Sequence, residues 1–287
     1  MKRNLVVFFL LSLSFQLYTQ SFNGDTWENA RKSGKADIVV TYAEVPKYSE
    51  MIDGQPSGIC FEIMDHFKEF VESTYGIQVN IQNRSINDPT NWGAFMESVR
   101  SSSGGVFGLG DVSITEDRQL QYKFSPPYLA NVAILVTNKD VSSLSSIEHI
   151  SSEFSGMTAV VQRGSSHDKR VQKLQKLYGG FDITYVDNSA EKITTVLSSS
   201  RYFTYIDFPN YLESILDGVN IKRHGEGDDA GEKFGILMPK NSDWSGVMRS
   251  FFQSNGGYTL SDRYRKSLKD NLGEKILRLT DALAQKD

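Results

Sequence analysis

The stretch Gly110–Tyr128, GDVSITEDRQLQYKFSPPY, predicts how the rest of the chain is arranged. It opens with small and β-branched residues that fit the end of a buried strand, and it turns near Thr115. Two prolines just before its end exclude a helix interior there. Arg118 follows the turn, and a guanidinium beyond a strand end can hold a planar carboxylate through two hydrogen bonds. A surface arginine at an ordinary turn is the alternative, because a short motif alone does not fix a role.

On both sides of this stretch, short apolar or β-branched segments alternate with segments of helical periodicity. In the segment 58–75, for example, apolar residues recur every four positions from Ile59 to Val71, as on one face of a helix. Glycine at position 76 is placed to end that helix. Strands that alternate with helices predict an α/β fold with parallel sheets.

The alternation divides into two blocks, so we predict two lobes. Lobe 1 is expected over 36–136 and 236–287, and lobe 2 over 137–235. Near the end of the second block, the segment 225–231, GEGDDAG, is predicted to be a loop, and the apolar segment 234–239, FGILMP, a strand that returns to lobe 1. A cleft between two lobes is the usual place for a small ligand.

The first twenty residues have the pattern of a secretory signal peptide. Lys2 and Arg3 precede an apolar run from Leu5 to Leu13 that is too short to span a bilayer. The residues before position 20 lack the small-residue cleavage pattern, and a buried N-terminal strand or helix is the alternative. We therefore predict a signal peptide over 1–20 and a soluble, periplasmic mature protein.

The composition excludes several kinds of partner. The formal net charge is -4, and it becomes -6 (29 basic minus 35 acidic residues) once the signal peptide is removed. A mildly acidic chain without a basic cluster is a poor candidate for binding nucleic acid or an anionic membrane. The one cysteine, Cys60, cannot form an internal disulfide and lies in an apolar helix, so we predict a buried structural thiol.

Five stretches, in this order, resemble the amino-acid-binding family of extracytoplasmic solute-binding proteins, family 3. They are EVPKYSEMIDGQPSGICFEIMDHF (44–67), NWGAFMESVRS (91–101), the stretch quoted first, VVQRGSS (160–166) and FGILMPKNSDW (234–244). The resemblance covers almost all of the mature chain, and the stretch quoted first is its most specific part. It implies a two-lobed type II periplasmic-binding-protein fold, related to the ligand-binding cores of ionotropic glutamate receptors. In that fold, two open sheets flanked by helices are joined at a hinge of two crossing segments.

The resemblance implies ligand contacts in lobe 1. Arg118 stands where the family's arginine holds the ligand α-carboxylate, and Ser113 stands where a hydroxyl contacts the ligand ammonium and carboxylate. Asp111 stands where a backbone carbonyl usually accepts from the ammonium. Trp92 stands at a pocket wall of the family, although a core tryptophan is an equally good interpretation.

In lobe 2 the resemblance implies the other half of the site. Ser165 and Ser166 stand where backbone N–H groups and a hydroxyl meet the same carboxylate, and they open a helix, whose free N–H groups favour an anion. Asp207 stands where a carboxylate pairs with the ligand ammonium. Plain helix capping is the alternative for these positions.

Two positions depart from the family, and they bear on the ligand. Asp111 replaces a small residue, and Glu44 stands where the family often has an aromatic wall. If both point into the cleft, it holds three carboxylates, including that of Asp207, and one guanidinium, that of Arg118. This excess of negative charge favours a basic or polar amino acid or a related amine. Side chains that face solvent or pair with a neighbour are the alternative.

An enzyme on the same fold, such as a dehydratase, is an alternative of another class. Glu44 and Asp207 could act as acid or base, but no assembled catalytic motif is present. The four histidines lack metal-ligand spacing, and His66 and His167, each beside an aspartate, are predicted to be solvated. We therefore predict no catalytic residue, no metal and no cofactor.

The partner implied by the resemblance is an ABC permease in the inner membrane, which would receive the ligand. The chain ends about 20 residues after the fold is expected to close, which favours a stand-alone, monomeric binder over a fused enzyme or kinase. A sensory or orphan binder is the alternative. Crossings near 137–140 and 231–235 are predicted to form the hinge.

Overall fold

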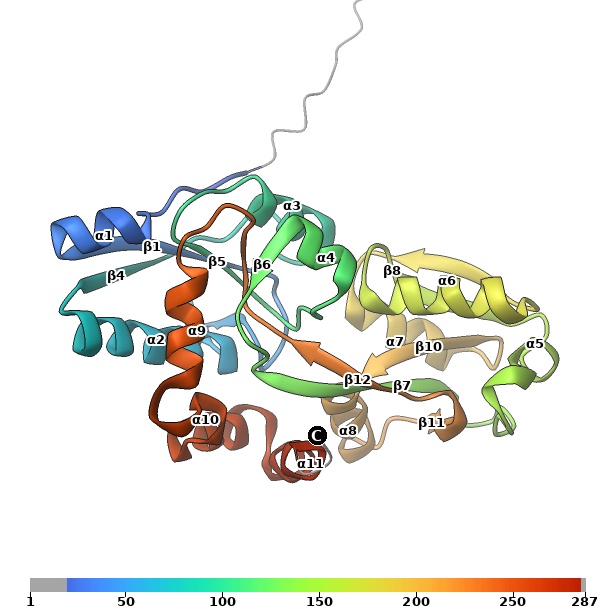
Figure 1. The fold of residues 1–287 in the computed structure, drawn as a ribbon. Helices are drawn as coiled ribbons and strands as arrows, with labels where there is room; N and C mark the ends of the chain where they lie inside the picture. Colours follow the sequence, from blue (N-terminus) through green and yellow to red (C-terminus); the bar gives the residue numbers. More distant parts are fainter. Residues whose placement is uncertain (1–19, 285–287) are drawn as a thin grey trace, which may run out of the picture.

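The computed structural model describes residues 20–284, and of Ser189, Ala190 and residues 282–284 it describes the backbone alone. The predicted signal peptide lies outside the described residues, apart from its last position. The described chain forms two lobes, each built around its own sheet, and passes between them twice (Figure 1). Between residues 20 and 284, no helix is both long and apolar enough to cross a membrane.

The first lobe contains a five-stranded sheet in the order β4-β1-β5-β13-β6. Strand β1 is parallel to β4 and β5, whereas β13 is antiparallel to β5 and β6. Its strands are β1 (Lys35–Tyr42), β4 (Gln78–Asn83), β5 (Val106–Leu109), β6 (Tyr122–Phe124) and β13 (Leu237–Pro239). A separate hairpin joins β2 (Glu50–Ile52) and β3 (Gln55–Ser57).

Helices cover this sheet, and the longest of them forms as the sequence predicts. The side chains from Ile59 to Val71 that repeat every four positions are buried, and the helix ends at Gly76 with φ 67°. The α-helices of this lobe are α1 (Trp27–Ser33), α2 (Ile59–Tyr75), α3 (Trp92–Arg100), α4 (Glu116–Gln121), α9 (Ser245–Gln253), α10 (Asp262–Leu272) and α11 (Glu274–Ala284). Two 3-10 turns, η3 (Ser254–Gly256) and η4 (Tyr258–Leu260), join α9 to α10.

The second lobe contains a six-stranded sheet in the order β11-β7-β10-β8-β9, with β12 also paired to β7. Strand β10 is parallel to β8 and antiparallel to β7. Its strands are β7 (Leu129–Asn138), β8 (Thr158–Gln162), β9 (Asp182–Val186), β10 (Tyr202–Asp207), β11 (Ile221–Arg223) and β12 (Asp229–Phe234). Its helices are η1 (Ile147–His149), α5 (Ile150–Glu153), α6 (Ser166–Tyr178), α7 (Ser189–Ser198), α8 (Phe208–Leu216) and η2 (Gly225–Gly227).

Of the two crossing segments, the first lies before its predicted position near 137–140, and the second lies where it was predicted, near 231–235. Strands β7 and β12 pair with each other and lie in the second sheet, so the chain crosses between the lobes just before Leu129 and just after Phe234 (Figure 1). The prediction of a loop over 225–231 is wrong in part, because β12 begins at Asp229. The sequence of β12, DAGEKF, has no apolar run, because β12 lies at an edge of the sheet, where β7 is its one partner among the strands of the described chain.

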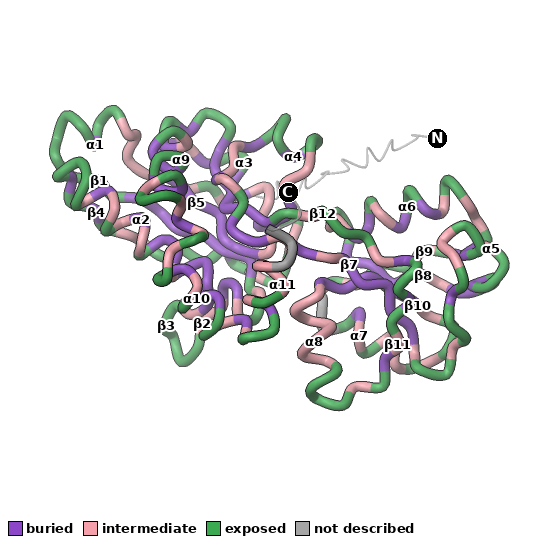
Figure 2. Tube along the Cα trace, turned by 60° about the horizontal axis from the view of Figure 1, so that its bottom comes forward, coloured by how far each residue is buried: buried purple, intermediate pink, exposed green. Residues whose placement is uncertain are grey.

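The two lobes have separate cores, and the buried residues follow the two sheets (Figure 2). In the first lobe, Phe67 and Trp244 are fully buried and their rings meet edge to face at 6.0 Å. Cys60 is buried in α2, as predicted, where the loss of solvation raises the pKa of its thiol to about 12. It is therefore a structural thiol at neutral pH.

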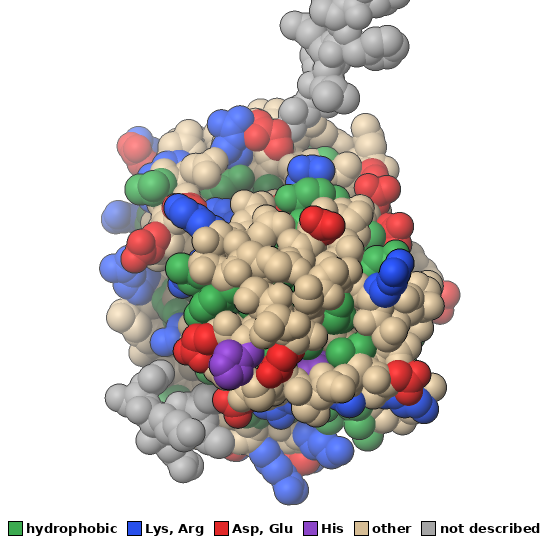
Figure 3. All heavy atoms as spheres, turned by 90° about the vertical axis from the view of Figure 1, so that its right-hand side faces the viewer, with side chains coloured by type: hydrophobic (Ala, Val, Ile, Leu, Met, Phe, Trp, Pro, Cys, Tyr) green, Lys and Arg blue, Asp and Glu red, His purple; other side chains and the backbone are tan. Residues whose placement is uncertain are grey.

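The end face of the second lobe carries mixed charge. Acidic and basic side chains are interspersed on this face of the described chain, and they do not gather into a single patch (Figure 3). Such a mixture differs from the clustered basic surface that nucleic acids select.

Candidate ligand-binding site

A cavity of about 480 Å³ lies between the lobes. The first lobe lines it with the segments after β1 and β5 and with the start of α3. The second lobe lines it with the ends of β8 and β10 and with α6, α7 and α8. Both sheets therefore present the carboxyl ends of parallel strands to one space, which is where α/β sheets bind ligands.

Seven of the eight residues predicted for the site line this cavity. They are Glu44, Trp92, Asp111, Ser113, Ser165, Ser166 and Asp207. Arg118 does not line it. The structure thus brings together residues that lie up to 163 positions apart along the chain (44 to 207).

Arg118 lies behind the cavity wall. It belongs to α4, which Thr115 caps, and only 6% of it is exposed, so it is no surface arginine. Its Nη1 donates to the Ser113 carbonyl at 3.0 Å, and its Nη2 donates to the Gly164 carbonyl of the second lobe at 3.4 Å. The guanidinium also lies 5.4 Å from the centre of the Trp92 ring. Arg118 therefore links the two lobes directly.

The start of α6 offers an anion site. Ser165 caps this helix by accepting from the Asp168 N–H at 3.1 Å, so the capping interpretation holds for its side chain. The Asp168 carboxylate in turn accepts from the Gly164 N–H at 2.8 Å. The N–H groups of Ser166 and His167 lie in the first turn, where no intrahelical acceptor exists. They carry the positive end of the helix dipole at the cavity.

Asp207 ends β10 and lies deep in the second lobe. It precedes α8, but its side chain makes no capping bond; the Phe208 N–H donates instead to Asn131 Oδ1 at 3.2 Å. The Asp207 carboxylate accepts from Asn131 Nδ2 at 2.6 Å and lies 3.4 Å from His167 Nε2. Burial acts to raise the pKa of Asp207, but His167, Lys192 and Asn131 hold it below its usual value. Asp207 is therefore ionised at neutral pH, and its side chain does not cap α8.

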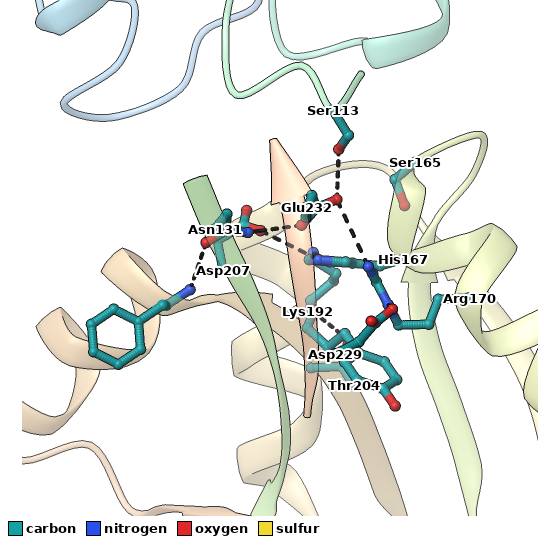
Figure 4. A network of polar contacts seen from close by, with 12 residues as sticks. Ser113, Asn131, Ser165, His167, Arg170, Lys192, Thr204, Asp207, Asp229 and Glu232 are labelled. Atoms are coloured by element: carbon teal, nitrogen blue, oxygen red, sulfur yellow. Dashed lines mark hydrogen bonds and ion pairs between the residues drawn. The ribbon is translucent and has the colours of Figure 1, made fainter. Parts of the chain in front are cut away.

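Four residues of the site were missed in the sequence: Asn131, His167, Lys192 and Glu232. Glu232, on β12, accepts from Ser113 Oγ at 2.6 Å and from Asn131 Nδ2 at 2.8 Å (Figure 4). The Asn131 amide on β7 therefore joins two carboxylates from different strands. No local motif marks these residues, because β7, β12 and α7 are brought together only by the sheet.

The prediction that His167 is solvated is wrong. It is 4% exposed and lines the cavity, since the first turn of α6 faces the cleft. Burial lowers its pKa, and the nearby charge of Asp207 opposes this shift. His66 is half-buried, with Nδ1 2.7 Å from the Tyr258 hydroxyl, so it also has a structural contact.

Trp92 serves in both of the ways that the sequence left open. It lines the cavity at the start of α3, and its ring packs against the core residue Phe95 with centroids 5.8 Å apart. Its Nε1 is buried without a hydrogen-bond partner.

The residues that line the cavity are mostly acidic: Glu44, Asp111, Asp207, Glu213 and Asp217. Burial and the charge of Asp207 raise the pKa of Asp111 to about 7, which marks a crowded set of carboxylates. Lys192, however, lines the same cavity and is 5% exposed. Glu44 is exposed at the rim, where solvent and salt screen its charge more than that of a buried carboxylate. The predicted excess of negative charge is thus partly offset by Lys192.

A metal ion fits the described residues poorly. Ligand atoms of His167, Asp207 and Glu232 lie within 4.8 Å of one another. However, the Asn131 amide already donates to both carboxylates, and the Lys192 ammonium lies 3.5 Å from the other nitrogen of His167. A cation there would have to displace these hydrogen bonds and would meet a second positive charge.

Solved structures of amino-acid-binding proteins share this fold. The arginine-, lysine- and histidine-binding protein ArtJ from Geobacillus stearothermophilus aligns with a TM-score of 0.64 at 18% identity, over 83% of this chain and 96% of its own. An ancestral arginine-binding protein bound to arginine aligns at 0.62 and 21% identity, over 84% and 99%. GshT, described in glutathione import with the cystine ABC importer TcyBC of Streptococcus mutans, aligns at 0.65 and 16% identity, over 83% and 95%.

The comparisons establish the fold. No protein-family model matches the chain, and no curated protein matches it. At these identities the solved structures show a shared architecture, which is the two-lobed type II periplasmic-binding-protein fold expected from the sequence.

Proposed function

We propose that this protein binds a small amino-acid-like solute outside the cytoplasm, by closing its two lobes around it, and delivers it to an ABC permease. The observation that carries the proposal is the pairing of two opposite subsites in one inter-lobe cavity. The first turn of α6 offers free N–H groups for a carboxylate. Asp207 and Asp111 offer carboxylates for an ammonium.

Arg118 supports closure from outside the cavity. Its guanidinium holds carbonyls of both lobes, Ser113 and Gly164, and so orients the two walls that would enclose the ligand carboxylate. In this proposal its positive charge also stabilises that carboxylate at longer range, because a buried charge is weakly screened. Ligands that bind such a site from both sides favour the closed arrangement of the lobes.

Substitution of each half of the site tests the proposal. Purified mature protein would be screened by thermal shift and calorimetry against the twenty amino acids, putrescine and spermidine. We expect a rise in Tm with at least one of them, since a ligand that binds only the folded state stabilises it. Asp207→Asn and Arg118→Met are expected to weaken binding of that ligand by about thirtyfold or more.

Asp182→Asn, an exposed change on β9, is the matched control. Unchanged affinity in Asp207→Asn would contradict the assignment of the ammonium subsite. A screen without any Tm shift would overturn the proposal as a whole.

An enzymatic role is the second candidate, and one observation favours it. A carboxyl group at a ligand-sized cavity with a pKa of about 7, as at Asp111, can exchange a proton at neutral pH. One solved structure with this fold is an ancestral amino acid-binding protein described as a precursor of cyclohexadienyl dehydratase, with a TM-score of 0.61 at 16% identity. Mass spectrometry of each bound ligand after prolonged incubation would decide, because a binder returns it unchanged.

A further inference from the structure

Lys192 is the single lysine or arginine among the residues that line the cavity. It lies on α7, in the second lobe, and 5% of it is exposed. A lysine is rarely buried to this extent unless a partner compensates its charge. The position of its ammonium, next to a space of ligand size, therefore needs a physical reason.

The described part of the chain satisfies this ammonium poorly. Its Nζ can donate three hydrogen bonds, and the contact it makes is with His167 Nδ1, at 3.5 Å. No described residue places a carboxylate oxygen within 4.0 Å of it. Burial lowers the pKa of Lys192, and the more distant charges of Asp207, Asp111 and Glu232 only partly oppose that shift. The site thus contains a positive charge with free donor capacity.

Two of the three nearest carboxylates are engaged by other donors. Asp207 accepts from Asn131, and Glu232 accepts from both Asn131 and Ser113. These hydrogen bonds hold the two carboxylates on β10 and β12, whereas Lys192 lies on α7. They lower the energy of the acidic groups without consuming the donors of Lys192.

We propose that Lys192 is a ligand-binding residue that receives an anionic oxygen from the side-chain end of the ligand, so that the site prefers acidic amino acids to basic ones. This inference rests on the proposed function. The carboxylate and ammonium of the ligand backbone are placed at the start of α6 and at Asp207. The rest of the second-lobe wall comes from α7 and α8, and on α7 Ile193 lies beside Lys192 in the lining.

The same geometry disfavours a cationic side chain. A lysine or arginine ligand would bring a second positive charge beside the buried Lys192 ammonium, where a low dielectric leaves the repulsion weakly screened. The other carboxylates of the lining compensate such a charge poorly, because Glu44 and Asp217 are exposed and Glu213 pairs with Lys47 at 2.7 Å. The sequence predicted a basic or polar ligand because no local pattern shows that Lys192 lines the cavity.

The test compares wild type with Lys192→Met, which removes the charge and keeps an unbranched side chain, and with Lys173→Met, an exposed control on α6. Calorimetry with L-glutamate, L-aspartate, L-glutamine, L-lysine and L-arginine measures each affinity. We expect wild type to bind glutamate or aspartate at least about tenfold more tightly than lysine or arginine. Lys192→Met should lose about thirtyfold for the acidic ligand, and Lys173→Met should lose nothing.

Several results would overturn the inference. One such result is that wild type prefers lysine or arginine, and another is that folded Lys192→Met keeps the affinity for the acidic ligand. In either case Lys192 does not bind an anionic group of the ligand, while the proposed function stands. If wild type binds none of the twenty amino acids, putrescine or spermidine, both fail. The ranking of ligands by wild type tests the inference even if Lys192→Met does not fold.

Discussion

The residues that decide this site are charged groups held in unequal surroundings. Asp207 is stabilised as an anion by His167 and by the Asn131 amide, which hold its pKa down. Asp111 receives no comparable hydrogen bond from a side chain, and burial together with the charge of Asp207 raises its pKa to about 7. Asp207 is thus ionised before a cationic group binds. Asp111 ionises most readily once a cationic group lies beside it.

The unequal pKa values predict how ligand binding depends on pH. An ammonium beside Asp111 favours the ionised carboxylate, so binding releases the proton that Asp111 holds below about pH 7. We expect the affinity of the wild-type ligand to rise with pH up to about 7 and then to level off. Calorimetry in buffers with different ionisation enthalpies measures the released proton. Asp111→Asn should release none, and a flat affinity in wild type from pH 5 to 8 would contradict the prediction.

The same group predicts a change in stability. The folded-state pKa of Asp111 lies above its ordinary value of 3.8, so the carboxylate costs stability as the pH rises through 7, and this cost is absent near pH 4. Asp111→Asn should therefore stabilise the ligand-free protein at pH 8 by up to about 4 kcal/mol and change little at pH 4. Urea unfolding at both pH values measures this. An equal gain at both would mean that the effect is steric.

At the scale of elements, helix starts and strand ends place the site. The Ser165 cap fixes the first turn of α6 against the cleft, and the polar strand β12 brings Glu232 into contact with Ser113 of the first lobe. The α6 start was predictable because Ser165 and Asp168 have the spacing of a capping box. Strand β12 was not, because an edge strand paired on one side needs no apolar pattern.

Removal of helix caps should separate stability from binding. Ser165→Ala and Ser261→Ala each delete a side-chain oxygen that caps a helix, α6 and α10 respectively. Each is expected to cost about 1 kcal/mol of unfolding free energy, measured by urea titration. Of these two helices only α6 begins at the cavity, so Ser165→Ala should also weaken ligand binding and Ser261→Ala should not. Equal affinities in the two variants would show that the α6 start does not hold the ligand.

At the scale of the molecule, ion pairs at the surface join the lobes around the cavity. Lys47 pairs with Glu213 at 2.7 Å, and Lys169 pairs with Asp117 at 2.6 Å, each from one lobe to the other. These side chains are substantially exposed, so each pair stabilises the closed arrangement by at most about 1 kcal/mol. Together they bias the lobes toward the closed arrangement without fixing it.

Disruption of these pairs should open the ligand-free protein. We expect the double variant Lys47→Ala/Lys169→Ala to have a larger radius of gyration in small-angle scattering than wild type. Its ligand affinity should fall by about two- to tenfold, since opening competes with binding. Lys32→Ala/Lys266→Ala breaks two pairs within the first lobe and is the matched control. Identical scattering of both double variants would contradict a role in closure.

By itself, the sequence determined the two-lobed α/β fold through its periodicity, and its resemblance to solute-binding proteins implied that Asp111, Ser165 and Asp207 lie at the ligand. Strand and helix periods are local, and residues that follow parallel strands collect at one edge of a sheet. Only the tertiary structure decided that Arg118 is held by backbone carbonyls, that Lys192 lines the cavity and that Glu232 accepts from Ser113. The reason is physical: whether a charge is buried, and which group compensates it, depends on elements far apart in the chain, and no local pattern records it.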